Sequence, residues 1–269
     1  MTTIKKSYIK NHDLFFKYSK SYYLGALLFP FKKFKLICAF YGFVRHIDNI
    51  VDKFQDKEKL EIEKGKFFSM YDSRVCQDNF YLALLDTINK LKLPRDVFER
   101  FFDSMEMDIN NVSYETMDDL KKYMDGSAQV IGEVMLYIMV NNSSHELIKY
   151  ARKLGEAFQL TNFIRDIKED YNMNPKRIYI PNEYLKKYNV TFENEIVDDR
   201  FIRMIRELII INRTLYKEAQ KGIDCLPDED RAAIQLSKNL YSSILNEIED
   251  SSYELFGSKI KVSFYSKLW

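Results

Sequence analysis

Two segments decide the fold prediction: YGFVRHIDNIVD at residues 41–52 and QLTNFIRDIKED at residues 159–170. In each segment, carboxylate or amide side chains recur every three or four residues within an apolar run, which places them on one face of an α-helix. The first face carries Asp48 and Asp52, and the second carries Asn162, Asp166 and Asp170. Carboxylates on the apolar side of a helix are costly unless positive charge meets them. A cluster of Mg²⁺ ions shared between the two helices would supply that charge, because Mg²⁺ prefers oxygen ligands together with an anionic substrate.

Each acidic row also has a structural interpretation. A pair of acids at this spacing usually lies on a solvated face or is neutralised by a neighbour, and Arg45 could serve the first row. Arg165 and Lys168 could pair with the acids of the second row. The apolar flanks of both rows and the presence of two rows favour the metal site, since perturbed acidic clusters mark functional sites.

Helical periodicity dominates the rest of the chain, and alternating strand patterns are scarce. Asn141–Ser144 offers an N-cap between two apolar segments, and Pro94 and Pro227 mark further boundaries. The sequence therefore predicts one all-α domain spanning residues 1–269, a helical bundle with short connections. The predicted helices are Leu36–Phe54, Glu58–Asp72, Phe80–Leu91, Arg95–Asn110, Met117–Val140, His145–Asp170, Arg200–Cys225 and Glu229–Leu255.

Composition excludes several classes of protein. The chain has 269 residues with 41 Lys+Arg against 40 Asp+Glu, so no overall positive field favours nucleic acid. Three unpaired cysteines predict neither a zinc site nor a disulfide framework and fit a reducing, cytoplasmic compartment. No signal peptide, membrane-spanning run or glycine-rich phosphate loop is evident.

Gly126, Gly132 and Gly155 fall inside predicted helices, where glycine costs about 1 kcal/mol relative to Ala. Either these glycines allow close helix–helix approach, or they kink the helices to open space for a ligand. The aromatic content of 15% could line such a space or simply fill the core. A metal-bound diphosphate beside an apolar, aromatic cavity would suit the ionisation of an allylic diphosphate, because the dry cavity protects a carbocation.

Taken in order, the motifs resemble those of the squalene/phytoene synthase family over nearly the whole chain. The first row is similar to the family's D-x-x-x-D motif preceded by Tyr-x-x-x-Arg, and the second is similar to its N-x-x-x-D-x-x-x-D motif. Arg177-Ile-Tyr-Ile-Pro181, Ser19-Lys-Ser-Tyr22 and Met105-Glu-Met-Asp108 also resemble family segments. The chain departs from the family at Asn49, where a second Asp is common, and at Gln129, where Gly is usual. Gln129 would either narrow the cavity or contact a diphosphate.

This resemblance implies an isoprenoid-synthase fold in which two prenyl diphosphates bind one central cavity. It implies that Asp48 and Asp52 ligate Mg²⁺, three ions in all, on one wall and that Asn162, Asp166 and Asp170 do so on the other. It places Tyr179 near the metal cluster and Tyr241 near the reacting centre as further catalytic residues. It assigns substrate binding to Ser19, Ser21, Tyr22, Tyr41, Arg45, Gln159, Arg165, Lys259 and Lys261.

The implied reaction couples two prenyl diphosphates head to head through a cyclopropyl diphosphate. Small residues at Gly25, Ala26 and Cys38 would leave room for long tails, which favours geranylgeranyl diphosphate and the product phytoene. Farnesyl diphosphate giving dehydrosqualene, or squalene with NADPH, is the near alternative. A terpene cyclase using one diphosphate and a non-catalytic assembly factor of the same fold are the others. Shallow contact with a membrane would help an apolar product to leave.

Overall fold

The described residues of the computed structural model are 3–54, 56–110, 113–141 and 144–257, with only the backbone described at 20, 21 and 52–54. They form α-helices, one π-helix and a single isolated bridge between Ser113 and Ile178, which confirms the all-α prediction. The helices are α1 (Thr3–Tyr18), α2 (Lys20–Ala26), α3 (Phe31–Phe54), α4 (Lys57–Ser73), α5 (Leu82–Leu91), α6 (Arg95–Asn110), α7 (Met117–Met124), η1 (Asp125–Gln129), α8 (Val130–Met139), α9 (His145–Arg165), α10 (Ile167–Tyr171), α11 (Asn182–Tyr188), α12 (Asp199–Asp224) and α13 (Asp228–Asp250).

Side-chain caps fix several helix starts. Thr116 and Asp119 form a reciprocal capping box at the start of α7, and the Ser144 hydroxyl accepts a hydrogen bond from the backbone N–H of Leu147 at the start of α9. Ser144 thereby confirms the cap predicted for that connection.

Two predicted helices are interrupted in the structure. The segment predicted as Met117–Val140 contains the π-helix Asp125–Gln129, and the segment predicted as His145–Asp170 breaks at Asp166, where φ is −98° and ψ is 15°. The last predicted helix ends at Asp250 and not at Leu255, because Ser252 and Tyr253 adopt positive φ angles of 56° and 65°. Helices α1, α2 and α11 were not predicted.

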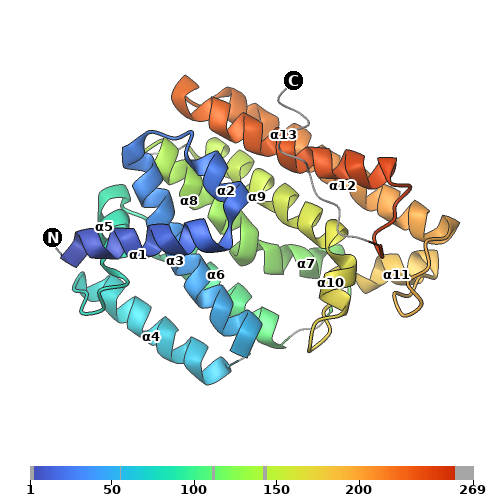
Figure 1. Cartoon of the computed structure of the whole chain (residues 1–269), viewed down its shortest axis with the longest axis horizontal. Helices are drawn as coiled ribbons and strands as arrows, with labels where there is room; N and C mark the ends of the chain where they lie inside the picture. Colours follow the sequence, from blue (N-terminus) through green and yellow to red (C-terminus); the bar gives the residue numbers. More distant parts are fainter. Residues whose placement is uncertain (1–2, 55, 111–112, 142–143, 258–269) are drawn as a thin grey trace.

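Helix α9 is the central element of the arrangement. It packs against α8 and η1 as well as against α12 and α13, while α3 packs against α1, α5 and α4. Figure 1 shows α12 and α13 running side by side above α9, with α1 and α2 in front of it. Two hydrophobic clusters result, one mainly from α1 to α8 and the other mainly from α7 to α13. Among the described residues, no helix is long and apolar enough to cross a membrane.

Candidate active site

An elongated cavity of about 550 Å³ lies between these helices, a volume within the usual range for ligand pockets. Its walls come from α1, α2, α3, η1, α8, α9, α12 and α13. On α9 the lining residues run from Leu147 to Asn162, a rise of about 22 Å along the helix axis. Polar residues gather at the Asn162 end, and the Leu147 end is lined by apolar side chains such as Met139 and Leu226. The cavity is therefore shaped for a long apolar chain with a polar head.

Helix α3 supplies the first polar wall through Tyr41, Arg45 and Asp48, which lie one helical turn apart and all line the cavity. The Arg45 guanidinium lies 5.0 Å from the centre of the Tyr18 ring. Burial raises the pKa of Tyr41, while Arg45 and a hydrogen bond with Ser19 oppose the rise. Tyr41 is thus a neutral hydroxyl beside a fixed positive charge, a pairing suited to an anionic group.

Helix α9 supplies the opposite polar wall. Gln159 and Asn162 line the cavity, with the Asn162 Nδ2 atom 3.5 Å from Gln159 Oε1. Asp166 follows at the helix break and accepts a hydrogen bond of 2.7 Å from Nε of Arg165. Asp170 lies one turn further, in α10, with its backbone N–H bonded to the Asp166 carbonyl at 2.9 Å.

The structural interpretation of the second row is therefore confirmed for one acid. Asp166 pairs with Arg165, whereas Lys168 pairs with Glu195 at 3.4 Å. In the part of the chain that is described, no three His, Cys, Asp or Glu side chains come together as metal ligands. The Asp52 side chain lies outside the described residues, so the predicted metal cluster stays a prediction.

Two unpartnered atoms test whether the site fits Mg²⁺ and a diphosphate. Within the described structure, Asn162 Oδ1 and Arg45 Nε are buried and have no hydrogen-bond partner. Both residues line the polar end of the cavity, on opposite walls. A free amide oxygen is a hard ligand of the kind that Mg²⁺ takes, and a free guanidinium N–H suits a phosphate oxygen. Asn162 and Arg45 therefore fit a site for Mg²⁺ and a diphosphate.

An aromatic cluster connects this polar end to α13. Tyr22 lines the cavity and stacks on Tyr241, with ring centroids 5.2 Å apart. Tyr241 also packs on Phe158 at 4.5 Å but is not itself a lining residue. The Tyr22 ring is 41% exposed, yet its hydroxyl group lies among Tyr241, Asn162 and Arg165, and burial raises its pKa. Burial raises the pKa of Tyr241 to about 12, so this hydroxyl stays protonated at neutral pH.

A buried ion pair holds the loop that follows Asp170. Arg177 donates a hydrogen bond of 2.7 Å to Asp108 Oδ2, and the Tyr179 hydroxyl donates one of 2.8 Å to Asp108 Oδ1. The backbone N–H of Arg177 also donates to the Asp170 carbonyl at 2.9 Å. Tyr179 does not line the cavity, but stacks on Phe163 with centroids 4.2 Å apart. Asp108 is the partner of Tyr179 and Arg177 that sequence reasoning missed.

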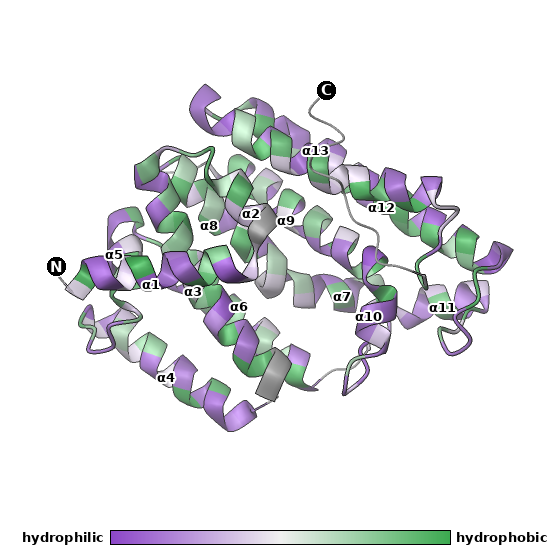
Figure 2. Cartoon of the chain, viewed as in Figure 1, coloured by the Kyte–Doolittle hydropathy of each residue, from purple (hydrophilic) through white to green (hydrophobic). Residues whose placement is uncertain are grey.

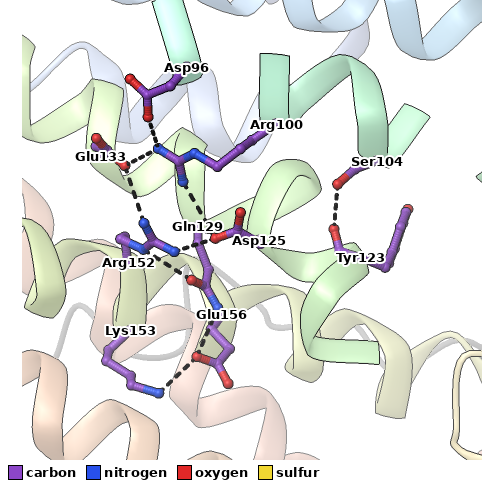
Figure 3. Close-up of polar contacts among 10 residues, drawn as sticks. All are labelled: Asp96, Arg100, Ser104, Tyr123, Asp125, Gln129, Glu133, Arg152, Lys153 and Glu156. Atoms are coloured by element: carbon purple, nitrogen blue, oxygen red, sulfur yellow. Dashed lines mark hydrogen bonds and ion pairs between the residues drawn. The ribbon is translucent and has the colours of Figure 1, made fainter. Parts of the chain in front are cut away.

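Gln129 was predicted to narrow the cavity or to contact a diphosphate, and its position supports neither prediction. It is not a cavity-lining residue, and its amide donates to Glu156 at 3.2 Å and accepts from Arg152 Nε at 3.1 Å. Figure 3 shows it within a polar network of side chains from α6, η1, α8 and α9. The network also joins Arg100 to Glu133 at 2.8 Å, and contains Asp96, Asp125, Arg152 and Lys153. This network was not predicted.

The three helical glycines allow close approach of helix backbones. A Cβ atom on Gly126 would lie 1.8 Å from the Arg100 carbonyl oxygen, one on Gly132 2.2 Å from that of Ala151, and one on Gly155 2.3 Å from that of Ala128. Gly132 and Gly155 also line the cavity. These contacts confirm the close-approach interpretation, and Gly132 and Gly155 lie within the uninterrupted helices α8 and α9.

The structure places some of the remaining predicted residues, and others lie outside its described part. Ser19 and Asp48 line the cavity as expected, and the Asp52 and Ser21 side chains lie outside the described residues. Lys259 and Lys261 also lie outside them. Cys38 is buried in the core and does not line the cavity, unlike Gly25 and Ala26.

A closed helical array around an apolar cavity with a polar end defines an enzyme of the isoprenoid-synthase type. The chain belongs to the squalene/phytoene synthase family, whose family model matches residues 16–266. It is 27% identical to the 4,4'-diapophytoene synthase of Staphylococcus haemolyticus (strain JCSC1435), covering 95% of this chain and 92% of that protein. It is 30% identical to the phytoene synthase of Arthrospira platensis, covering 94% and 87% respectively.

Structural similarity agrees with the family assignment. A crystal structure of a dehydrosqualene synthase superposes with a TM-score of 0.90 at 25% identity, covering 97% of this chain and 93% of that one. The predicted isoprenoid-synthase fold is confirmed, and the chain is a prenyltransferase of a family that condenses prenyl diphosphates head to head.

Proposed function

We propose that the protein catalyses the Mg²⁺-dependent condensation of two geranylgeranyl diphosphates into phytoene through a cyclopropyl diphosphate. The observation that carries the proposal is the cavity, with its polar end between Arg45 and Asn162 and its apolar length along α9. A C20 prenyl chain of four isoprene repeats, each with four bonds of about 1.5 Å, spans roughly 20 Å when extended. This length matches the lined stretch of α9, about 22 Å. A C15 chain, at roughly 15 Å, would leave the distal end empty.

The residues of α2 also support the longer chain. Gly25 and Ala26 line the cavity, so little side-chain bulk projects from this wall. The curated relatives named phytoene synthases include the one at 30% identity.

In the proposed reaction the side chains have separate tasks. Asp48, Asp52, Asn162, Asp166 and Asp170 would hold Mg²⁺, which supplies electrostatic stabilisation of the departing diphosphate when bound. Arg45 and Ser19 would bind diphosphate oxygens, and the protonated hydroxyl of Tyr22, whose ring is held by stacking on Tyr241, would orient them. The apolar walls would exclude water from the allylic cation, and the rings of Phe158 and Tyr41 would face it.

Farnesyl diphosphate is the second candidate substrate, favoured by the structural likeness to a dehydrosqualene synthase. The purified protein should be incubated with Mg²⁺ and each diphosphate in turn, and the hydrocarbon identified by mass spectrometry, with and without NADPH. We expect a C40 hydrocarbon that does not depend on NADPH. Formation of C30 product only, from separate and mixed substrates, would refute the phytoene proposal, and a cyclic product from one prenyl chain would indicate a terpene cyclase.

The two acidic rows are tested by Asp48→Asn and Asp166→Asn. Each substitution should lower kcat by roughly 10²–10³-fold, as expected for removal of one group that stabilises a developing charge. Circular dichroism should show an unchanged fold. Full activity in either variant would contradict a site formed between the two walls.

A further inference from the structure

Positive charge is concentrated at the start of the chain. Residues 1–36 contain eight lysines and a single carboxylate, Asp13, a net charge of +7 in a chain whose total is +1. No Asp or Glu occurs between residues 14 and 47. Lys33 is paired with Glu229 and Asp230 of α13, and the remaining lysines give the N-terminal helices a local positive field that the whole-chain composition conceals.

Exposed apolar side chains are concentrated in the same region. Of the thirteen large hydrophobic residues exposed in the described part of the chain, nine lie within the first 31 residues. Five of these nine lie between residues 16 and 31 and do not line the cavity: Phe16 (57% exposed), Leu24 (46%), Leu27 (50%), Leu28 (51%) and Phe31 (72%). Such a concentration marks an interaction surface.

Ring contacts join these side chains into one face. Phe16 on α1 packs against Tyr23 on α2, with centroids 5.2 Å apart. The Lys35 ammonium lies over the rings of both Tyr8, at 5.4 Å, and Phe31, at 5.3 Å, which connects α1 to the start of α3. Figure 2 shows hydrophobic ribbon along the end of α2 and the loop that follows it. We call Phe16, Leu24, Leu27, Leu28 and Phe31, with Lys17, Lys32 and Lys35, the N-terminal face.

The inner side of the same segment is a wall of the cavity. Gly25, Ala26 and Phe29 line the cavity, while their neighbours Leu24, Leu27 and Leu28 are exposed on the N-terminal face. One layer of residues thus separates the apolar cavity from the apolar surface.

We propose that the N-terminal face docks on an anionic lipid bilayer, so that the α2 wall of the cavity meets the hydrocarbon phase. Apolar side chains flanked by lysines are typical of interfacial binding, in which the long lysine stems reach the headgroups. A second copy of this face is a poor occupant because two faces of high positive charge repel each other. The choice of a lipid phase rests on the proposed function, since a long hydrocarbon product needs an apolar destination.

The test is sedimentation of the full chain, without substrate, with vesicles of phosphatidylcholine alone or mixed with phosphatidylglycerol. The wild-type protein should bind the anionic vesicles, and Leu27→Ser/Leu28→Ser/Phe31→Ser should weaken binding at least about 100-fold through lost apolar insertion. Lys17→Gln/Lys32→Gln should weaken it by about fivefold per charge. The matched control Ile62→Ser/Val75→Ser/Ile210→Ser removes equally exposed side chains elsewhere and should bind as wild type.

Failure of the wild type to bind anionic vesicles, or wild-type binding by the triple-serine variant, would overturn the proposal. So would sedimentation velocity showing that the face joins two copies of the chain instead. Turnover in detergent provides a separate readout, in which the triple-serine variant should equal the wild type. If vesicles are bound but no diphosphate gives a hydrocarbon, the docking surface stands and the proposed function fails.

Discussion

The buried contacts of Asp108 with Arg177 and Tyr179 allow a quantitative prediction. Asp108 and Arg177 are 6% and 4% exposed, and their charged atoms are 2.7 Å apart. Asp108→Asn keeps the side-chain shape but removes the carboxylate that meets the buried Arg177 charge. Breaking one partner of such a pair costs about 3–5 kcal/mol in free energy of unfolding. For a chain of this size the melting temperature should fall by roughly 6–20 °C.

Tyr179→Phe separates the hydrogen bond from the ion pair. It removes one bond to an ionised carboxylate and should cost about 1.5–3 kcal/mol. Asp108→Asn combined with Arg177→Met should cost less than the two single substitutions added together, because the second removes the charge that the first leaves unpaired.

Urea unfolding followed by circular dichroism at pH 7 measures these free energies. Glu115→Gln is the matched control, because it breaks an exposed pair with Lys186 at 3.0 Å and should leave the free energy of unfolding close to that of the wild type. The reasoning is refuted if Asp108→Asn costs no more than this control. Since the Arg177 side chain anchors the loop after Asp170 to Asp108, Arg177→Met should lower kcat where the control does not.

Three further predictions concern the core and the cavity. The pKa of Glu63 is lowered from 4.5 to about 2 by hydrogen bonds with His46, Lys66 and Tyr81. The wild type should therefore be more stable than Glu63→Gln, with the full difference present above pH 4.5 and falling by about 1.4 kcal/mol per pH unit towards pH 2. Urea unfolding at a series of pH values measures this difference. Gly155→Ala should destabilise by about 1–3 kcal/mol through the clash with the Ala128 carbonyl, whereas Gly65→Ala, which meets nothing within 4 Å, should not. Ala26→Phe should shift the product mixture from C40 to C30 chains by filling the cavity wall, and Leu27→Phe, on the outer face, should leave it unchanged.

Apolar periodicity predicted the helices whose buried face is hydrophobic. The limits of Arg95–Asn110 agree with α6, and most others agree within a few residues. Helix α1 was missed because its buried positions are Ser7, Asn11 and Phe15, two of them polar. Their partners are backbone groups distant in sequence, since Ser7 and Asn11 both donate to the Phe80 carbonyl. No local pattern announces such contacts.

The interruptions within helices were equally invisible in the sequence. A π-helix depends on a change in hydrogen-bond register, which composition does not encode, and the segment Asp125–Gln129 is polar enough to read as an ordinary helix surface. Asp166 was predicted to be in mid-helix, yet it caps α9. The residues of both acidic rows were predicted from spacing, but the orientation of the second row depends on this break and on Arg165.

The polar network around Gln129 and the acidic rows use the same residue types with different consequences. In the network around Gln129, Glu133 and Glu156 are 5% and 2% exposed, and both carboxylates are paired with arginine or lysine side chains. At the polar end of the cavity, by contrast, Asn162 Oδ1 and Arg45 Nε are buried with no partner within the described structure. Burying such atoms costs free energy, and a ligand bound at this end of the cavity would offset that cost. The charge pattern in the sequence cannot separate the paired network from the polar end of the cavity. Buried atoms without partners at the end of an apolar cavity make that distinction, and they mark the end at which the proposed diphosphate and Mg²⁺ would bind.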